Sequence, residues 1–163
     1  MAQIYISIGS NIDPKKYIRN SIKALRQQYG QLQVSSVYES EAVGFEGDNF
    51  YNLVVGAQTN DTPQHIQQTL RQIEHDNQRE RNTAKFSART LDLDLLLYDD
   101  WIIKEQSLEI PRDEIEKYAF VLQPLAEIAP DAAHPQSKQA YKDLWQAYDK
   151  SKQPLWIIEF ELG

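Results

Sequence analysis

The sequence predicts an α+β fold of the ferredoxin-like class, a sandwich in which helices pack on an antiparallel sheet. Two observations lead to this prediction. Stretches with strand and helix periodicity follow one another in the order β-α-β-β-α-β over residues 4–98, and turn or capping residues separate them. The rest of the chain predicts C-terminal helices and an extra edge strand. Because 163 residues are enough to bury one core without disulfides, we expect a single domain over residues 1–163.

The first strand and the first helix are each marked at their ends. Residues 4–8 have the apolar pattern of a strand, which ends at Gly9-Ser10-Asn11. Asp13 and Pro14 suit the N-cap and the first position of a helix. The helix has apolar residues at helical spacing and is expected to end near Gly30; these residues are Tyr17, Ile18, Ile22 and Leu25.

Two strands are expected next, at residues 32–38 and 50–57. The connection between them, residues 39–49, contains Gly44 and Gly47 and is longer than a tight hairpin. Long glycine-containing loops on such a scaffold are natural sites for closing over a ligand. We therefore regard this connection as a candidate part of a binding site.

The second half of the chain begins with another helix start at Asp61-Thr62-Pro63. The helix that follows has Ile66, Leu70 and Ile73 at helical spacing. The remaining predicted elements are a polar loop at 77–89, a strand at 91–98, helices at 115–122 and 141–148, and an edge strand at 155–160.

Within the fourth strand, residues 89–96 contain an aspartate pair. Asp92 and Asp94 alternate with leucines, so their side chains share one face, with Cα atoms roughly 6.6 Å apart. Carboxylates this close repel each other unless a cation lies between them. Oxygen ligands of this kind suit Mg²⁺, whose remaining positions substrate phosphates commonly fill. The alternative is an edge strand whose aspartates face water, but aspartate is a poor strand former.

Five basic residues precede this pair between positions 71 and 89. They are Arg71, Arg79, Arg81, Lys85 and Arg89. Arginine matches the geometry of phosphate oxygens, so this segment predicts a phosphate-binding region. Cations at the end of a helix would explain Arg79 and Arg81 by interaction with the helix dipole alone, but they would not explain Lys85 and Arg89.

Composition and charge exclude several classes. A formal net charge of −7 argues against a nucleic-acid partner, which requires a basic face. The absence of cysteine excludes thiolate zinc sites and thiol nucleophiles. Because no signal-peptide pattern or apolar run of transmembrane length occurs, we expect a cytoplasmic protein with no membrane partner. We also expect a monomer.

Four motifs resemble the pyrophosphokinase family that acts on 6-hydroxymethyl-7,8-dihydropterin in folate biosynthesis. They are Gly9-Ser10-Asn11, Tyr51-Asn52, the Arg-Thr-Leu-Asp-Leu-Asp string at 89–94, and Phe-Val-Leu-Gln-Pro-Leu at 120–125 with Ile128-Ala129-Pro130. The resemblance extends from about Ile4 to Ala132. The string at 89–94 is highly specific, whereas Gly-Ser-Asn alone is not.

The resemblance implies transfer of a pyrophosphoryl group from ATP to the hydroxymethyl oxygen of the pterin, with release of AMP. It also implies two Mg²⁺ ions held by Asp92 and Asp94. This scheme is physically coherent, because phosphoryl transfer depends on positioning and charge neutralisation more than on covalent help from the protein. The expected partners are thus two small molecules, ATP and a pterin.

The resemblance also implies which residues serve the nucleotide. Arg79, Arg81 and Arg89 would hold phosphate oxygens and complete the catalytic set with the two aspartates. The further nucleotide-binding candidates are Glu74, Lys85, Leu95 and Arg112. For Glu74 the alternative is a solvated carboxylate on a helix.

Pterin recognition requires a flat slot with amide-type hydrogen bonding at its edge. By resemblance, Phe120 and Asn52 are the leading candidates. The others are Ser40, Val43, Gly44, Phe50 and Phe86. The alternatives are that Phe120 is a core residue and that Asn52 is a turn residue at a strand end.

The sequence departs from the family pattern at several positions. Arg112 follows Pro111 where the family has histidine, Tyr118 replaces an arginine, and Phe86 replaces a tryptophan. Arg112 could supply a cation to the phosphates in place of the lost groups. The departures leave two alternatives: a paralogue that binds pterin or nucleotide without turnover, and an enzyme for a different pterin.

Overall fold

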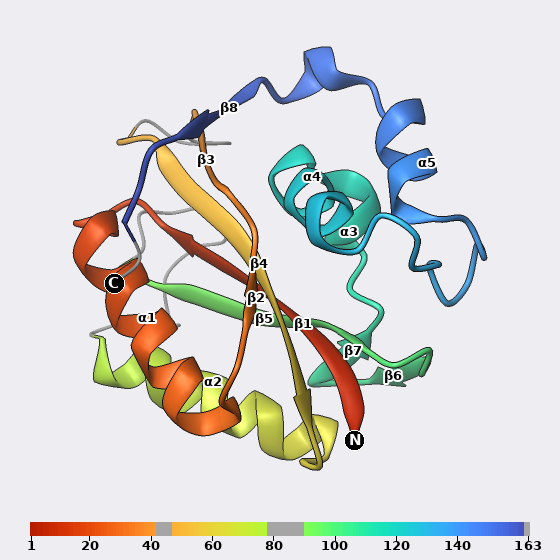
Figure 1. The fold of residues 1–163 in the computed structure, drawn as a ribbon, viewed down its shortest axis with the longest axis horizontal. Coiled ribbons are helices and arrows are strands. Elements are labelled where there is room, and N and C mark those ends of the chain that lie inside the picture. The colour runs from red at the N-terminus through yellow and green to blue at the C-terminus, as the bar shows by residue number, and fades with distance from the viewer. Residues whose placement is uncertain (42–46, 78–89, 162–163) are drawn as a thin grey trace.

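A computed structural model describes residues 1–41, 47–77 and 90–161. Its main sheet is formed by β1 (Ala2–Ser10), β2 (Gln33–Val34), β3 (Val37–Ser40), β4 (Phe50–Thr59), β5 (Asp92–Tyr98) and β8 (Leu155–Ile158). The strand order is β5-β1-β4-β3-β8, with β2 paired to β4, and every pairing is antiparallel. Figure 1 shows helices on both sides of this sheet. The predicted α+β class is confirmed.

One face of the sheet packs on α1 (Pro14–Tyr29) and α2 (Pro63–Asp76). Its core is made by alternate residues of β1, because side chains of a strand point to opposite faces in turn. Ile4, Ile6 and Ile8 are at most 1% exposed. The apolar residues predicted for both helices lie in this core. Thr62 caps α2 as its position suggests, accepting a hydrogen bond from His65 N at 3.2 Å.

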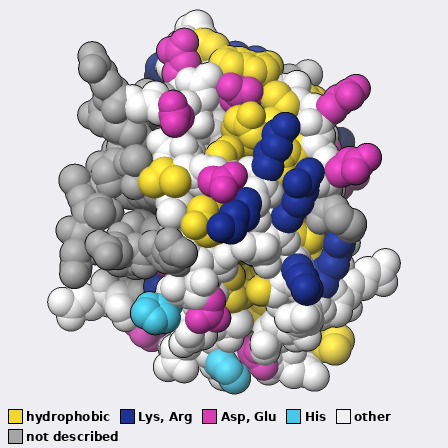
Figure 2. All heavy atoms as spheres, turned by 90° about the vertical axis from the view of Figure 1, so that its left-hand side faces the viewer, with side chains coloured by type: hydrophobic (Ala, Val, Ile, Leu, Met, Phe, Trp, Pro, Cys, Tyr) yellow, Lys and Arg dark blue, Asp and Glu magenta, His cyan; other side chains and the backbone are white. Residues whose placement is uncertain are grey.

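The outer face of α1 is basic. Its exposed side chains include Lys15, Lys16, Arg19, Lys23 and Arg26, and the helix contains no acidic residue. Figure 2 shows Lys and Arg side chains gathered in a band on this side of the molecule. The helix is therefore amphipathic, with an apolar stripe on the sheet and a solvated cationic face.

The two ends of α1 lie where the sequence predicts them. Pro14 is the first helical residue, and Gly30 ends the helix with φ of 79°. Asp13 is the N-cap residue, as predicted, but it does not cap the helix through its side chain. Asp13 has φ of 44° and its side chain makes no cap hydrogen bond, since a left-handed residue turns its side chain away from the helix N–H groups.

The strand predicted at 32–38 is interrupted. Ser35 and Ser36 separate β2 from β3, and both are held by side-chain contacts. Ser35 Oγ accepts from Val54 N at 3.0 Å, and the carboxylate of Glu127 accepts from Ser36 N at 3.0 Å. Side-chain oxygens from Ser35 and Glu127 thus accept from Val54 N and Ser36 N in place of strand carbonyl groups, which accounts for the break.

The opposite face of the sheet is covered in part by α3 (Glu114–Lys117), α4 (Ala119–Ile128) and α5 (Tyr141–Ala147). The single helix predicted at 115–122 is wrong, because Tyr118 is extended and separates α3 from α4. The end predicted at 122 is also wrong: α4 continues through Pro124. The buried Leu125 and Ala126 outweigh the hydrogen bond that a proline removes inside a helix.

The remaining elements are short. A hairpin of β6 (Ile103–Glu105) and β7 (Leu108–Ile110) was not predicted. The predictions of α5 and of a late edge strand, β8, are confirmed. Among the described residues, no helix is long and apolar enough to cross a membrane.

Candidate active site

The strand register brings the predicted residues to one face of the sheet. Asn52 of β4 lies opposite Gly9 of β1, and Gly9 lies opposite Asp92 of β5. Directly paired residues of antiparallel strands project to the same side. Asn52 and Asp92 therefore lie in one row across the sheet, with Gly9 between them.

Gly9 leaves the space that this row needs. A Cβ atom built on Gly9 would lie 2.7 Å from Asn52 Oδ1, closer than real Cβ contacts. The next residue, Ser10, is buried and donates from Oγ to Thr90 O at 2.5 Å. Gly9-Ser10 thus makes room for Asn52 and ties the end of β1 to the start of β5.

Asp92 and Asp94 have the arrangement that their spacing predicts. They occupy the partly exposed positions of β5, whereas Leu93 and Leu95 are buried on the opposite face. Asp94 lies opposite Ser7 in the register, and its side chain is 20% exposed. The two carboxylates therefore project from one face of an edge strand and are reachable by solvent.

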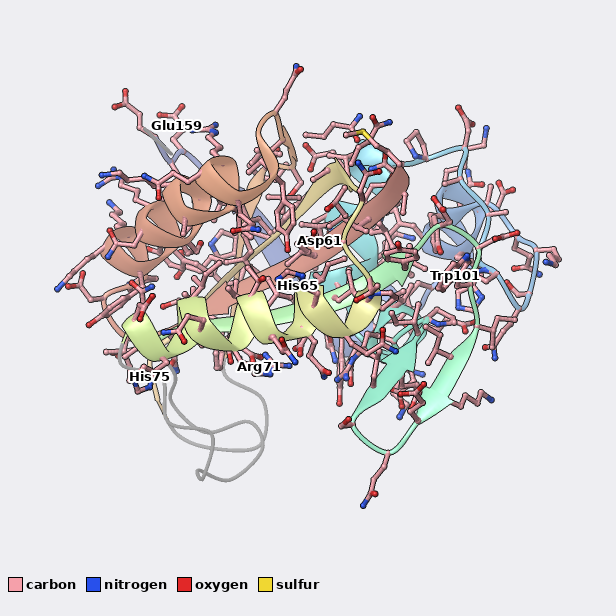
Figure 3. The ribbon with its side chains drawn as sticks, turned by 90° about the horizontal axis from the view of Figure 1, so that it is seen from below. Asp61, His65, Arg71, His75, Trp101 and Glu159 are labelled. Carbon is pink, nitrogen blue, oxygen red and sulfur yellow. The ribbon has the colours of Figure 1, made fainter. Side chains whose placement is uncertain are left out.

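Two residues of α2 hold the outer edge of β5. Leu93 N donates to Glu74 Oε2 at 2.7 Å, and Arg71 Nη1 donates to Leu93 O at 2.8 Å. Since β5 pairs with β1 alone among the described strands, these side chains satisfy backbone groups that an edge strand otherwise presents to water. Figure 3 shows α2 running beside β5, with Arg71 labelled on the helix.

Arg71 also contacts one aspartate of the pair formed by Asp92 and Asp94. Its Nη1 donates to Glu74 Oε1 at 3.0 Å, and its Nη2 donates to Asp94 Oδ1 at 3.3 Å. Glu74 is 1% exposed, so the alternative of a solvated helix carboxylate is wrong. Its role in nucleotide binding stays a prediction. The contacts make Glu74 a buried anchor that fixes both Arg71 and the backbone beside Asp94.

Arg112 lies further along the same edge. Its backbone N donates to Leu96 O at 3.1 Å, and its guanidinium makes two bonds to Glu114, at 2.7 and 3.0 Å. Burial raises the pKa of the Glu114 carboxyl, while the bonds from Arg112 act in the opposite direction. Both groups interact electrostatically with Asp94, so the cation predicted to serve the phosphates is near the aspartates but paired.

The candidates for the ring-binding slot lie at the same end of the sheet. Ser40 is directly opposite Phe50 in the register, two residues from Asn52, so all three project to the face of Asp92. Phe120, in the first turn of α4, is partly buried and stacks on Tyr118 with centroids 5.0 Å apart and planes 10° apart. The alternative that Asn52 is a turn residue is wrong, since it lies within β4.

The other candidates divide into two groups. The side chain of Leu95 lies in the core with α1 and α2, so only its backbone could contact a nucleotide. The rest lie outside the described residues: Val43, Gly44, Arg79, Arg81, Lys85, Phe86 and Arg89.

The sequence placed Arg71 in the predicted phosphate-binding region but did not predict its contacts with Glu74 and Asp94. The available signal was its spacing of three from Glu74, the helix distance at which an arginine and a glutamate meet. The burial of Glu74 had a signal too, because positions 66, 70, 73 and 74 form one helix stripe.

The side chains of Asp92 and Asp94 suit a hard cation whose remaining coordination positions are filled by other ligands. Among residues 1–41, 47–77 and 90–161, no group of three or more His, Cys, Asp and Glu side chains is suited to hold a metal. Two carboxylates on one face do fit Mg²⁺, which keeps waters and substrate phosphates in its shell instead of an all-protein cage. A cation held by these two carboxylates would have positions left for water or for phosphate oxygens.

Comparison with known proteins decides the family. Residues 5–130 match the family described as 7,8-dihydro-6-hydroxymethylpterin-pyrophosphokinase (HPPK). The chain belongs to this family. It is therefore an enzyme of the pyrophosphokinase type.

Two relatives of the chain are pyrophosphokinases by name. The 2-amino-4-hydroxy-6-hydroxymethyldihydropteridine pyrophosphokinase of Aquifex aeolicus is 36% identical over 145 residues, which cover 88% of this chain and 90% of that protein. The pyrophosphokinase of the same name from Bacillus subtilis is 37% identical over 128 residues, 76% of each chain.

A solved structure supports the fold. Wild-type HPPK-DHPS of Plasmodium falciparum with SDX-DHP aligns with a TM-score of 0.71 and 14% identity over 93% of this chain. The chain spans 44% of that protein. At this identity the likeness concerns the fold.

Proposed function

We propose that the protein transfers pyrophosphate from ATP to 6-hydroxymethyl-7,8-dihydropterin and releases AMP. The hydroxymethyl oxygen would attack the β-phosphorus of ATP, the bond from that phosphorus to the α–β bridging oxygen would break, and the hydroxyl proton would be lost. The observation that carries the proposal is the row across the sheet from Asn52 through Gly9 to Asp92. It brings an amide suited to a heterocycle within two strands of a carboxylate pair suited to Mg²⁺.

Asp92 and Asp94 would hold Mg²⁺ in this scheme, and we propose two ions. When bound, Mg²⁺ neutralises phosphate charge and orients the phosphate chain. Arg71 lies 3.3 Å from one aspartate and its guanidinium is held by a buried glutamate. It would keep that carboxylate in one orientation before any ligand arrives.

The acceptor would lie toward β4 and α4. Asn52 can both donate to and accept from the polar edge of a pterin, while Phe120 offers an aromatic face. Ser40 and Phe50 border the same region, because they pair directly with each other and lie on the same face as Asn52. Val43, Gly44 and Phe86 complete the proposed set for the acceptor.

The phosphate chain would be bound by the cations that precede β5. We propose Arg79, Arg81 and Arg89 as the residues that balance charge developing on the transferred group, with Lys85 beside them. Arg112 would contribute through its proximity to Asp94, although Glu114 already neutralises its charge.

The test is AMP formation by the purified protein. ATP, MgCl₂ and 6-hydroxymethyl-7,8-dihydropterin are incubated with the protein, and AMP is followed by chromatography, with parallel reactions that omit the pterin or contain excess EDTA. AMP that depends on both pterin and Mg²⁺ is the expected result. Bound pterin without AMP would indicate a paralogue without turnover, and AMP formed only with another pterin would identify a different acceptor.

A further inference from the structure

The C-terminal segment 148–158 lies beyond the residues that match the HPPK family, which end at 130. It nevertheless returns to the candidate site. Tyr148 Oη donates to Lys117 O at 2.7 Å, and Gln153 Oε1 accepts from Ala119 N at 2.9 Å. The segment then forms β8, which pairs with β3. It therefore contacts α3, α4 and the edge of the sheet.

The contacts at both ends of α4 fix its direction over the sheet. Near its C-terminal end, Glu127 accepts from Tyr38 Oη at 2.6 Å and from Ser36 N, at the start of β3. At its N-terminal end, Ala119 bonds to Gln153, two residues before Leu155, which lies opposite Ser40 at the end of β3. The first turn of α4, which contains Phe120, is therefore at the Ser40 end of the strand.

The start of α4 depends on this segment. The first N–H groups of a helix have no partner within the helix and need an acceptor from elsewhere. Tyr118, the N-cap residue of α4, makes no side-chain cap bond. Gln153, which is partly buried, supplies an acceptor for the first helical N–H instead, and Tyr148 binds the preceding turn.

We propose that segment 148–158 positions Phe120 for the pterin, with Gln153 as the positioning residue. This inference rests on the proposed function. Loss of the Gln153 acceptor frees the first turn of α4, and the stacked pair of Tyr118 and Phe120 moves with it. The segment acts on acceptor binding and leaves the nucleotide side, at the opposite edge of the sheet, unchanged.

The test compares Gln153→Leu with Gln153→Glu, which keeps an acceptor and places a negative charge at the helix N-terminus, where it is favourable. Dissociation constants for pterin and for an ATP analogue are measured by titration calorimetry, together with kcat and both KM values. We expect Gln153→Leu to weaken pterin binding roughly fivefold, the equivalent of one hydrogen bond, with ATP binding unchanged. Gln153→Glu should restore wild-type binding.

Two further variants keep the result interpretable. Gln146→Leu makes the same change on the exposed side of α5 and should bind both ligands like wild type. Tyr148→Phe removes the hydroxyl that donates to Lys117 O and should weaken pterin binding in the same direction, even if Gln153→Leu fails to fold.

The outcomes separate this inference from the proposed function. Pterin binding that is unchanged in Gln153→Leu and Tyr148→Phe would overturn the positioning role alone, as would equal weakening of pterin and ATP binding. Wild-type protein that binds pterin but forms no AMP would overturn the proposed reaction while the binding comparison still stands. No pterin binding by wild type would overturn both.

Discussion

Gly9 and Asn52 face each other across β1 and β4, and the side chain of Asn52 occupies the volume that a Cβ atom at Gly9 would fill. The distance from that Cβ position to Asn52 Oδ1 is 2.7 Å. A glycine at the end of the first strand is therefore a requirement of close approach, since no left-handed backbone conformation is involved. It links the first motif of the chain to the amide that we propose for the pterin.

Gly9→Ala should displace Asn52. We expect the dissociation constant for pterin to rise about tenfold, equivalent to roughly 1.4 kcal/mol, and the free energy of unfolding to fall by about 1–3 kcal/mol from overpacking. Gly56→Ala is the matched control on the same two strands, because its Cβ would meet Tyr5 Cε1 and Gln33 Oε1 at 2.9 Å. If both variants lost stability alike and neither lost pterin affinity, Asn52 would not bind the pterin.

Removing the buried carboxylate of Glu74 should destabilise the edge of the sheet. Glu74→Ala leaves Leu93 N without its side-chain acceptor and removes the bond from Arg71 to Glu74, although Arg71 keeps its bonds to Leu93 O and Asp94. We expect the free energy of unfolding, measured with urea, to fall by about 3 kcal/mol. This is the lower end of the range for breaking a buried ion pair, because the side chain of Arg71 is 31% exposed. The control is Asp76→Ala on the exposed side of the same helix, which should cost less than about 1 kcal/mol. Equal effects would show that the buried contacts contribute little.

Asp94→Asn should separate catalysis from folding. The side chain keeps its size and loses the charge that a Mg²⁺ ligand needs, so we expect turnover to fall at least about a thousandfold. Unfolding free energy should change by less than about 1 kcal/mol, because the contact with Arg71 is a partly exposed pair. Circular dichroism and urea titration measure the second quantity. A variant that is unstable but still active would contradict the metal role.

Acid should weaken the fold through His134. Burial lowers the pKa of this histidine, partly opposed by Glu116, and its Nδ1 accepts from Gln136 N and Ser137 N. Because the pKa is lower in the folded protein than in the unfolded chain, the unfolded chain binds the proton more readily. Unfolding free energy should therefore fall as pH drops below about 6.5, the unfolded value.

His134→Asn tests this dependence, since the asparagine carbonyl can accept the same two hydrogen bonds without titrating. Urea unfolding of wild type and variant at pH 7.5, 6.0 and 5.0 provides the comparison. As pH falls, the free energy of unfolding of the variant should rise relative to that of wild type. A difference that is constant with pH would exclude His134 as the titrating group.

Local patterns predicted much of this site because its parts lie within single elements. The alternation around Asp92 and Asp94 indicated their shared face, and Pro14 and Gly30 marked the limits of α1. The sequence alone could not show which strands pair, so the row from Asn52 to Asp92 emerged only from the register.

Contacts between distant segments explain the predictions that were wrong. The break at Tyr118 accompanies the bonds from Tyr148 and Gln153 to the residues beside it, more than 30 positions along the chain. The interruption of the strand at 32–38 depends in the same way on Glu127, which lies 91 positions from Ser36. No local period carries this information.

The most direct measurement is pterin-dependent AMP formation by Asp92→Ala/Asp94→Ala beside wild type. Glu105→Ala/Glu109→Ala is the matched control, since it removes two carboxylates from the exposed β6–β7 hairpin. We predict AMP from wild type and the control at similar rates and none from the aspartate variant, although all three fold and bind pterin. AMP formed by the aspartate variant at the wild-type rate would contradict the assignment of β5 as the metal-binding strand.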